Sequence, residues 1–149
     1  MKGFENHDMT SLAELVRRRE VSPAELLDAA LATARKVNER LTAIVVDAED
    51  AARARLSRGL PDGPFTGVPF LLKDMGCEAT DYPAHEGSRL MRNSRYPIDS
   101  HLFTRLAATG LVPFGRTAAP ENGIGVVTEA AVYGAPTRNP WNPAPTPGG

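Results

Sequence analysis

The pattern of apolar residues predicts a long amphipathic helix in the first third of the chain. Ser22 is followed by Pro23 and, three positions after Ser22, by Glu25, which is the pattern of a capping box with proline at the first helical position. Apolar residues then recur at helical spacing on one face: Leu27, Ala30, Leu31, Ala34 and Val37. We therefore expect a helix that begins at Ser22 and packs through this face.

Shorter elements flank this helix. A short helix is expected before it, with Ser11 and Glu14 as its capping box. After it, residues 41–46 form a β-prone run, and Asp47 is expected to cap a third helix that Gly59 ends. The beginning of the chain is thus predicted as a helical lead with a single strand.

Two apolar runs without polar alternation follow, at residues 68–72 and 111–114. Such runs are typical of strands that are buried on both faces of a parallel sheet. Between them, Asp99 and Ser100 are expected to start a helix that Gly110 ends, so that strand, helix and strand form a βαβ unit. The pattern predicts an α/β fold with a parallel sheet core.

The first of these runs ends in a charged residue, Lys73, which Asp74 follows. Ligands gather at the C-terminal edge of the strands in open α/β sheets, and partial burial lowers the pKa of a lysine side chain toward the range of a general base. We expect Asp74 to point away, because successive strand side chains face opposite sides. The alternative is a lysine that reaches solvent from a strand end.

Composition and charge narrow the class of protein. The chain has 149 residues, 42% of them hydrophobic, and a net charge of −1 without a basic stripe, which argues against binding to nucleic acid or an anionic membrane. We expect neither a signal peptide nor a membrane-spanning segment. Because Cys77 is the single cysteine, a reducing compartment and a cytoplasmic location are expected.

Two other kinds of site remain open. Cys77 could pair with His85 or His101 as a thiol–imidazole nucleophile, although no cation or helix start near Cys77 would lower the thiol pKa. The three histidines lack the spacing of a metal site. Alternatively, the proline-rich residues 140–145 could bind a protein partner as a polyproline II ligand, which would make the chain a non-catalytic module.

Several segments, in order along the chain, resemble the amidase signature family. They are "GVPFLLKD", "EGSRLM", "DSHLFTRLAATGLVPFGRT", "APENG" and "TEAAVYGAPTRNPWNPAPTPGG", and the helical lead is similar as well. The resemblance implies a mixed, largely parallel sheet covered by helices on both faces. It also implies an amidohydrolase that cleaves a carbon–nitrogen amide bond by a Ser–cis-Ser–Lys mechanism, without metal or organic cofactor. The expected partner is a small-molecule amide substrate, with no nucleic acid or membrane, and a homodimer is left open for the full-length enzyme.

The resemblance assigns roles to particular residues. Lys73 matches the catalytic lysine of the family. Asn122 and Gly123, in "APENG", correspond to a segment that lines the acyl pocket, and they are candidates for substrate binding, with a plain loop as the alternative. Residues 128–129 and 133–134 are interpreted as structural.

The triad that the resemblance implies is incomplete in this chain. In the family, the bridging serine directly follows the two glycines of a Pro-Gly-Gly segment, which is here residues 147–149. We therefore interpret residues 1–149 as the N-terminal portion of one amidase domain, with a helical lead (1–60), the start of the sheet core (61–133) and a Pro/Gly-rich loop (134–149). The serines of the chain match neither the bridging nor the nucleophilic position: Ser11, Ser22, Ser57, Ser88, Ser94 and Ser100.

Two further expectations follow from this interpretation. The fragment should be inactive alone, and Trp141 should pin its loop against a larger body, since an indole is readily buried. Within the family, the amidase subunit of a tRNA-dependent amidotransferase is the alternative function, but "APENG" and "PFLLKD" look more like the simple hydrolases.

Overall fold

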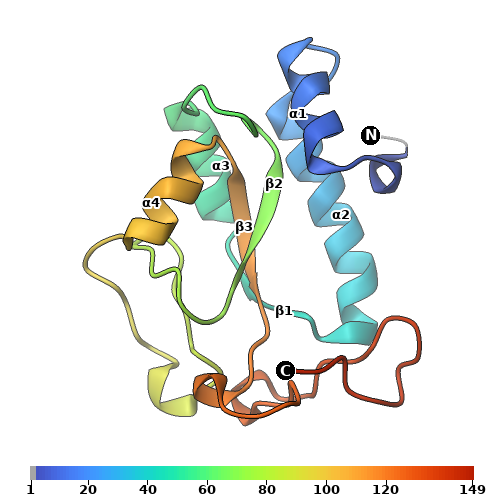
Figure 1. The fold of residues 1–149 in the computed structure, drawn as a ribbon, viewed down its shortest axis with the longest axis vertical. Helices are drawn as coiled ribbons and strands as arrows, with labels where there is room; N and C mark the ends of the chain where they lie inside the picture. Colours follow the sequence, from blue (N-terminus) through green and yellow to red (C-terminus); the bar gives the residue numbers. More distant parts are fainter. Residues whose placement is uncertain (1–2) are drawn as a thin grey trace.

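The computed structural model describes residues 3–149, and its centre is a three-stranded sheet (Figure 1). Strand β3 (Val112–Thr117) lies in the middle, between β1 (Ile44–Asp47) and β2 (Pro69–Lys73). β2 runs parallel to β3, whereas β1 runs antiparallel to it. The sheet is therefore mixed, and the parallel pairing predicted from the two apolar runs is confirmed.

The parallel pair is connected through α4 (His101–Ala108), which completes the predicted βαβ unit. The Ser100 hydroxyl caps this helix by accepting the N–H of Phe103 at 3.2 Å. After the helix, Gly110 has a φ of 85°, and a Cβ atom there would lie 2.5 Å from the backbone of Thr66. Only glycine fits this close approach, so Gly110 marks the end of the helix as predicted.

Helices lie on both sides of the sheet, and besides α4 they are α1 (Met9–Arg17), α2 (Pro23–Leu41) and α3 (Glu49–Arg58). Figure 1 places α2 and α4 on opposite sides of β2 and β3, while α3 lies along β3 and pairs with α2 through Arg35–Glu49 and Arg53–Asp28. Leu31 of α2 shares a buried cluster with Phe114 of β3, and Phe103 of α4 shares another with Leu72 of β2. Within residues 3–149, none of the helices has the length and apolar character needed to cross a membrane.

The helix starts agree with the sequence in one case and differ in another. The capping box of α2 is confirmed, since the Ser22 hydroxyl accepts the Glu25 N–H at 3.2 Å and the Glu25 carboxylate accepts the Ser22 N–H at 2.8 Å. The predicted box at Ser11 and Glu14 is wrong, because Asp8 caps α1 and accepts the Ser11 N–H at 2.7 Å. A carboxylate three residues earlier is a suitable acceptor for the free N–H groups, and it leaves Ser11 inside the first turn.

The first strand and the third helix have slightly different bounds from those expected. β1 begins later than predicted because α2 continues through Leu41. Ala48 takes the N-cap position of α3 by its backbone, but the Asp47 carboxylate accepts the Glu49 N–H at 2.8 Å, as a capping side chain would. Gly59, with a φ of 87°, ends α3 as predicted.

The C-terminal loop, residues 134–149, contains neither helix nor strand, as predicted. The Trp141 side chain is 95% exposed among the described residues, so its expected contact with a larger body stays a prediction. Within the described chain Thr137 attaches the loop, because its N–H donates to the Thr128 carbonyl at 2.9 Å and its hydroxyl donates to the Thr42 carbonyl at 2.8 Å. The loop is thus held by polar bonds close to its beginning.

One buried hydroxyl generates a stability prediction. Tyr82 is 2% exposed and packs against Phe103, yet its hydroxyl finds no hydrogen-bond partner among residues 3–149. Because an unsatisfied buried hydroxyl costs free energy, we expect Tyr82→Phe to leave the free energy of unfolding unchanged or to raise it by about 1 kcal/mol. Urea unfolding of the purified protein measures this.

The matched control is Tyr82→Leu, which removes the ring contact with Phe103 as well as the hydroxyl and should destabilise the protein. A loss of more than about 1 kcal/mol in Tyr82→Phe would contradict the assignment of an unsatisfied hydroxyl.

Candidate active site

The last residue of β2 and the residue after it lie in opposite environments. The Lys73 side chain is exposed, whereas Asp74 is fully buried. Among residues 3–149 the two side chains form no ion pair. They therefore diverge as strand alternation predicts, but the expected partial burial of Lys73 is wrong, because β2 ends at an open cavity.

Asp74 is buried among groups that satisfy its charge. Its carboxylate accepts the N–H of His85 at 2.7 Å and that of Gly87 at 3.5 Å, and it accepts the Tyr133 hydroxyl. Burial, reinforced by the bond to Asp74, raises the pKa of Tyr133, so the phenol keeps its proton and remains the donor. Asp74 thus ties the end of β2 to two segments that are distant in sequence.

Arg116 of β3 is the most extensively bonded side chain at this end of the sheet. It is fully buried, and its guanidinium donates to the carbonyls of Lys73 at 2.7 Å, Gly76 at 3.4 Å, Cys77 at 3.0 Å and Tyr82 at 2.7 Å. Burial lowers the pKa of Arg116, and the nearby Asp74 charge acts in the opposite direction. The turn after β2 therefore curls around a buried cation and is held through its main chain.

Lys73 lines a cavity of about 260 Å³ at the end of the sheet. Residues from six separate stretches of the chain line it: Ala43, Lys73, Thr117, Ala118, Pro120, Thr128, Thr137, Pro147, Gly148 and Gly149. The cavity brings the candidate base together with the Pro-Gly-Gly segment, which is nearly half the chain away in sequence. No serine is among its lining residues within the described part of the chain.

Asn122 and Gly123 lie in a short 3-10 helix, η3 (Glu121–Gly123), and do not line the Lys73 cavity. The N–H of Asn122 donates to the Glu86 carbonyl at 2.8 Å, and that of Gly123 donates to the Pro120 carbonyl at 3.0 Å. Both residues are exposed, so their carbonyls and the Asn122 side chain are the groups left to meet a ligand. Their role in substrate binding stays a prediction.

The thiol alternative is disfavoured by the surroundings of Cys77. The cysteine is buried, and burial raises the pKa of its thiol, which is opposite to the change that activates a nucleophile. His101 is exposed at the start of α4. Within residues 3–149, no group of His, Cys, Asp and Glu side chains is arranged to hold a metal ion.

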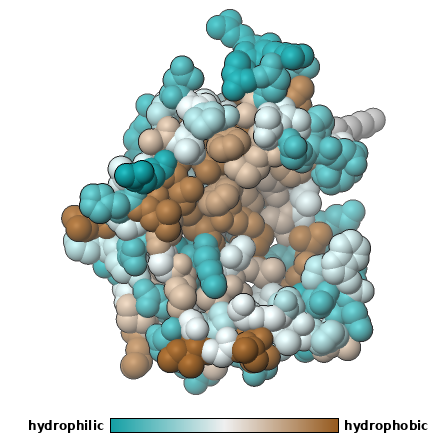
Figure 2. Space-filling model, viewed as in Figure 1, coloured by the Kyte–Doolittle hydropathy of each residue, from teal (hydrophilic) through white to brown (hydrophobic). Residues whose placement is uncertain are grey.

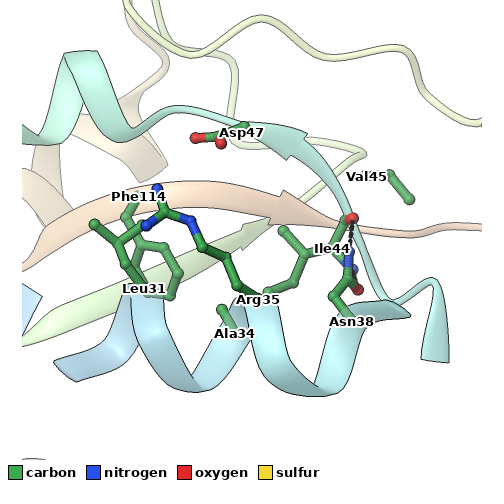
Figure 3. A pocket seen from close by; sticks show the side chains of 8 residues that line it. All are labelled: Leu31, Ala34, Arg35, Asn38, Ile44, Val45, Asp47 and Phe114. Atoms are coloured by element: carbon green, nitrogen blue, oxygen red, sulfur yellow. Dashed lines mark hydrogen bonds between the residues drawn. The ribbon is translucent and has the colours of Figure 1, made fainter. Parts of the chain in front are cut away.

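Two other hollows lack free chemical groups. A cavity between α2 and β1 contains Asn38, whose side chain donates to the Ile44 carbonyl at 2.8 Å, and Arg35, which pairs with Glu49 outside the cavity lining (Figure 3). A groove between α2 and β2 is almost entirely apolar and belongs to the brown area near the centre of Figure 2. The Lys73 cavity is the candidate active site, because it brings the lysine matched by the family resemblance together with the Pro-Gly-Gly segment.

Sequence reasoning did not assign a role to Arg116 or to the contacts of Tyr133. The sequence does contain a signal for Arg116. An arginine inside the apolar run "LVPFGRT" is either exposed to solvent or buried with hydrogen-bond partners, and this strand shows no polar face on which it could be exposed. The parallel register then places Arg116 beside Leu72 and Thr117 beside Lys73. Nothing local to Tyr133 indicates that it contacts Asp74.

Comparisons with known proteins agree on one kind of relative. A family model described as Amidase matches residues 24–149. The chain is 39% identical over 144 residues to the 6-aminohexanoate-cyclic-dimer hydrolase of Paenarthrobacter ureafaciens, covering 95% of this chain and 29% of that protein. It is 41% identical over 154 residues to a subunit of the glutamyl-tRNA(Gln) amidotransferase of Salinispora arenicola, covering 95% of this chain and 31% of that subunit.

A solved structure gives the same result at the level of the fold. The structure of a 6-aminohexanoate cyclic dimer hydrolase in complex with its substrate matches with a TM-score of 0.88 and 36% identity, covering 96% of this chain and 30% of that one. The chain thus spans less than a third of the length of the curated relatives named above. The described sheet corresponds to one part of a larger fold.

The bonds of Arg116 generate a second prediction. Arg116→Met should lower the free energy of unfolding by more than about 3 kcal/mol, because several buried carbonyls lose their donor at once and each unsatisfied group costs about 1–3 kcal/mol. Urea unfolding of the purified protein, or the yield of folded protein, measures the loss.

Arg105→Met is the matched control, because Arg105 lies on α4 and is not among the fully buried side chains. This change should stay within about 0.5 kcal/mol of the parent protein. Equal unfolding midpoints for the Arg116 and Arg105 variants would show that the buried guanidinium does not support the turn.

Proposed function

The chain belongs to the amidase family, and on this premise we propose that it is the N-terminal portion of an enzyme that hydrolyses a carbon–nitrogen amide bond. The observation that carries the proposal is the cavity shared by Lys73 and the Pro-Gly-Gly segment at residues 147–149. An exposed amine at the end of a strand can reach a reacting group in that cavity, whereas the neighbouring carboxylate is bonded elsewhere. The activity is a property of the whole protein, of which this chain supplies the base.

In the proposed reaction, a serine hydroxyl attacks the amide carbonyl while Lys73 receives the proton through a second serine. The tetrahedral intermediate collapses as the carbon–nitrogen bond breaks, and the proton passes to the leaving amine. Water then attacks the acyl-enzyme carbonyl while Lys73 again receives a proton. The ester bond to the serine breaks, the proton returns to the serine oxygen, and the carboxylic acid is released. No serine lines this cavity among the described residues, so residues 1–149 alone should be inactive.

We propose a linear or cyclic small-molecule amide as the substrate and a cytoplasmic enzyme, with no nucleic acid, no membrane and no metal or organic cofactor in the reaction. Homodimer formation by the full-length enzyme is compatible with this proposal. Support for an amide substrate comes from the relatives, since one of them is a hydrolase of a cyclic amide by its name.

The alternative function is the amidase subunit of a tRNA-dependent amidotransferase, which the 41% identity to such a subunit favours. The two functions differ in what they require. A simple amidase should release amine from small amides without other components, whereas the amidotransferase subunit should need partner subunits, glutamate-charged tRNA and ATP. Assaying the purified full-length protein under both conditions separates them.

The assignment of Lys73 generates a third prediction. In the full-length enzyme, Lys73→Ala should lower kcat/KM for amide hydrolysis by about 10²- to 10⁴-fold, because that is the usual contribution of a positioned general base. The thermal midpoint should change little, since the Lys73 side chain is exposed.

Lys36→Ala is the matched control, because it removes an exposed lysine from α2, outside the cavity that Lys73 lines. It should leave both turnover and the thermal midpoint unchanged. Full turnover in the Lys73 variant would rule out this lysine as the base.

A further inference from the structure

We propose that Thr128 is a positioning residue, which holds residues 146–149 against the Lys73 cavity and so fixes the distance between Lys73 and the Pro-Gly-Gly segment. This inference rests on the proposed amide hydrolysis for its catalytic consequence. Its structural part rests on the hydrogen bonds of a single buried side chain. Thr128 is 7% exposed and lines the same cavity as Lys73 and the Pro-Gly-Gly segment.

Thr128 bonds to this segment through both its side chain and its main chain. Its hydroxyl donates to the Gly148 carbonyl at 2.7 Å, and its N–H donates to the Thr146 hydroxyl at 3.4 Å. The Thr146 hydroxyl in turn accepts the Gly148 N–H at 3.3 Å, which closes a small turn. Thr128 thereby orients the peptide group that joins Gly148 to Gly149.

The segment also packs tightly against the backbone preceding Thr128. A Cβ atom at Gly149 would lie 2.7 Å from the Gly125 carbonyl oxygen and 2.8 Å from the backbone of Val126, so this position has no room for a side chain. The close approach limits how the segment can move, and the Thr128 hydroxyl supplies the directional bond. The close approach and the hydrogen bond together hold residues 146–149 in one position beside the cavity.

Thr128 is itself attached to the structure around Lys73. Its carbonyl accepts the Thr137 N–H at 2.9 Å, and a few residues after Thr128 the Tyr133 hydroxyl donates to Asp74, the neighbour of Lys73. The threonine therefore lies on a short stretch of chain that is bonded to Asp74 through Tyr133 and to the Pro-Gly-Gly segment through Thr128 itself. A bond so placed sets the distance between two chain segments that meet in the cavity.

The catalytic consequence follows from the geometry of proton transfer. A proton passes between groups only when they lie within hydrogen-bond reach, and a displacement of about 1 Å can cost on the order of 10²-fold in rate. Removing the Thr128 hydroxyl frees the Gly148 carbonyl and loosens the segment without touching Lys73. We therefore expect a loss in kcat rather than in substrate affinity.

The test compares Thr128→Val with Thr128→Ser in the full-length enzyme. Valine keeps the shape and removes the hydroxyl, so kcat should fall on the order of 10- to 100-fold while KM changes by less than about 3-fold. Serine keeps the hydroxyl and should retain most of the parent kcat. Thr104→Val, which removes an exposed threonine hydroxyl bonded to the Ser100 carbonyl on α4, is the control and should leave kcat unchanged.

Hydrogen exchange of the backbone N–H groups of Thr146, Gly148 and Gly149 gives a readout that does not depend on turnover. Exchange should be faster in Thr128→Val than in the parent and unchanged in Thr128→Ser. If the valine variant does not fold, Thr146→Val serves in its place, because this exposed residue accepts the N–H groups of both Thr128 and Gly148. It should likewise lower kcat and speed exchange.

The outcomes separate this inference from the function on which it rests. If the parent enzyme cleaves no amide, the proposed function fails, while faster exchange in the variants still supports the structural part. If the parent is active and the variant that removes the hydroxyl keeps its kcat, the positioning role of Thr128 is overturned. Unchanged exchange in that variant overturns the structural part as well.

Discussion

The bonds from the Arg116 guanidinium to the main chain hold the end of β2 and the turn after it in one arrangement. They reach the carbonyl of Lys73 itself and those of Gly76 and Cys77, which both have positive φ. The buried carbonyls of this turn need hydrogen-bond donors, and one planar guanidinium with five N–H groups can supply them from a single position. The direction in which Lys73 leaves the sheet depends on this cation.

A buried cation needs a compensating negative charge, and Asp74 supplies it for Arg116. Asp74 lies close to Arg116 and is satisfied by backbone N–H groups and by the Tyr133 hydroxyl. If this carboxylate faced Lys73 instead, it would stabilise the ammonium form and oppose its use as a base. Strand alternation, the buried arginine and the tyrosine together keep the two side chains apart.

Local patterns account for most of the elements but not for the site. The capping box at Ser22 predicted a helix correctly because it is decided by neighbouring residues, and the two apolar runs predicted the parallel pair because runs without alternation suit strands covered on both faces. Asp8 replaced Ser11 as a cap because two acceptors compete within one turn, and only the tertiary arrangement selects between them. The polar bonds of Thr137 that hold the C-terminal loop join residues far apart in sequence, and no local pattern indicates them.

The candidate site could be predicted only as far as Lys73, since the other parts come from distant segments. Thr128, Tyr133 and the Pro-Gly-Gly segment reach the end of β2 through bonds between residues that no periodicity relates. The segments that carry the family resemblance are the same ones that these bonds join. Their order along the chain therefore encodes a network around one cavity: the strand supplies the amine, the buried arginine and aspartate set its direction, and the threonine brings the glycine segment beside it.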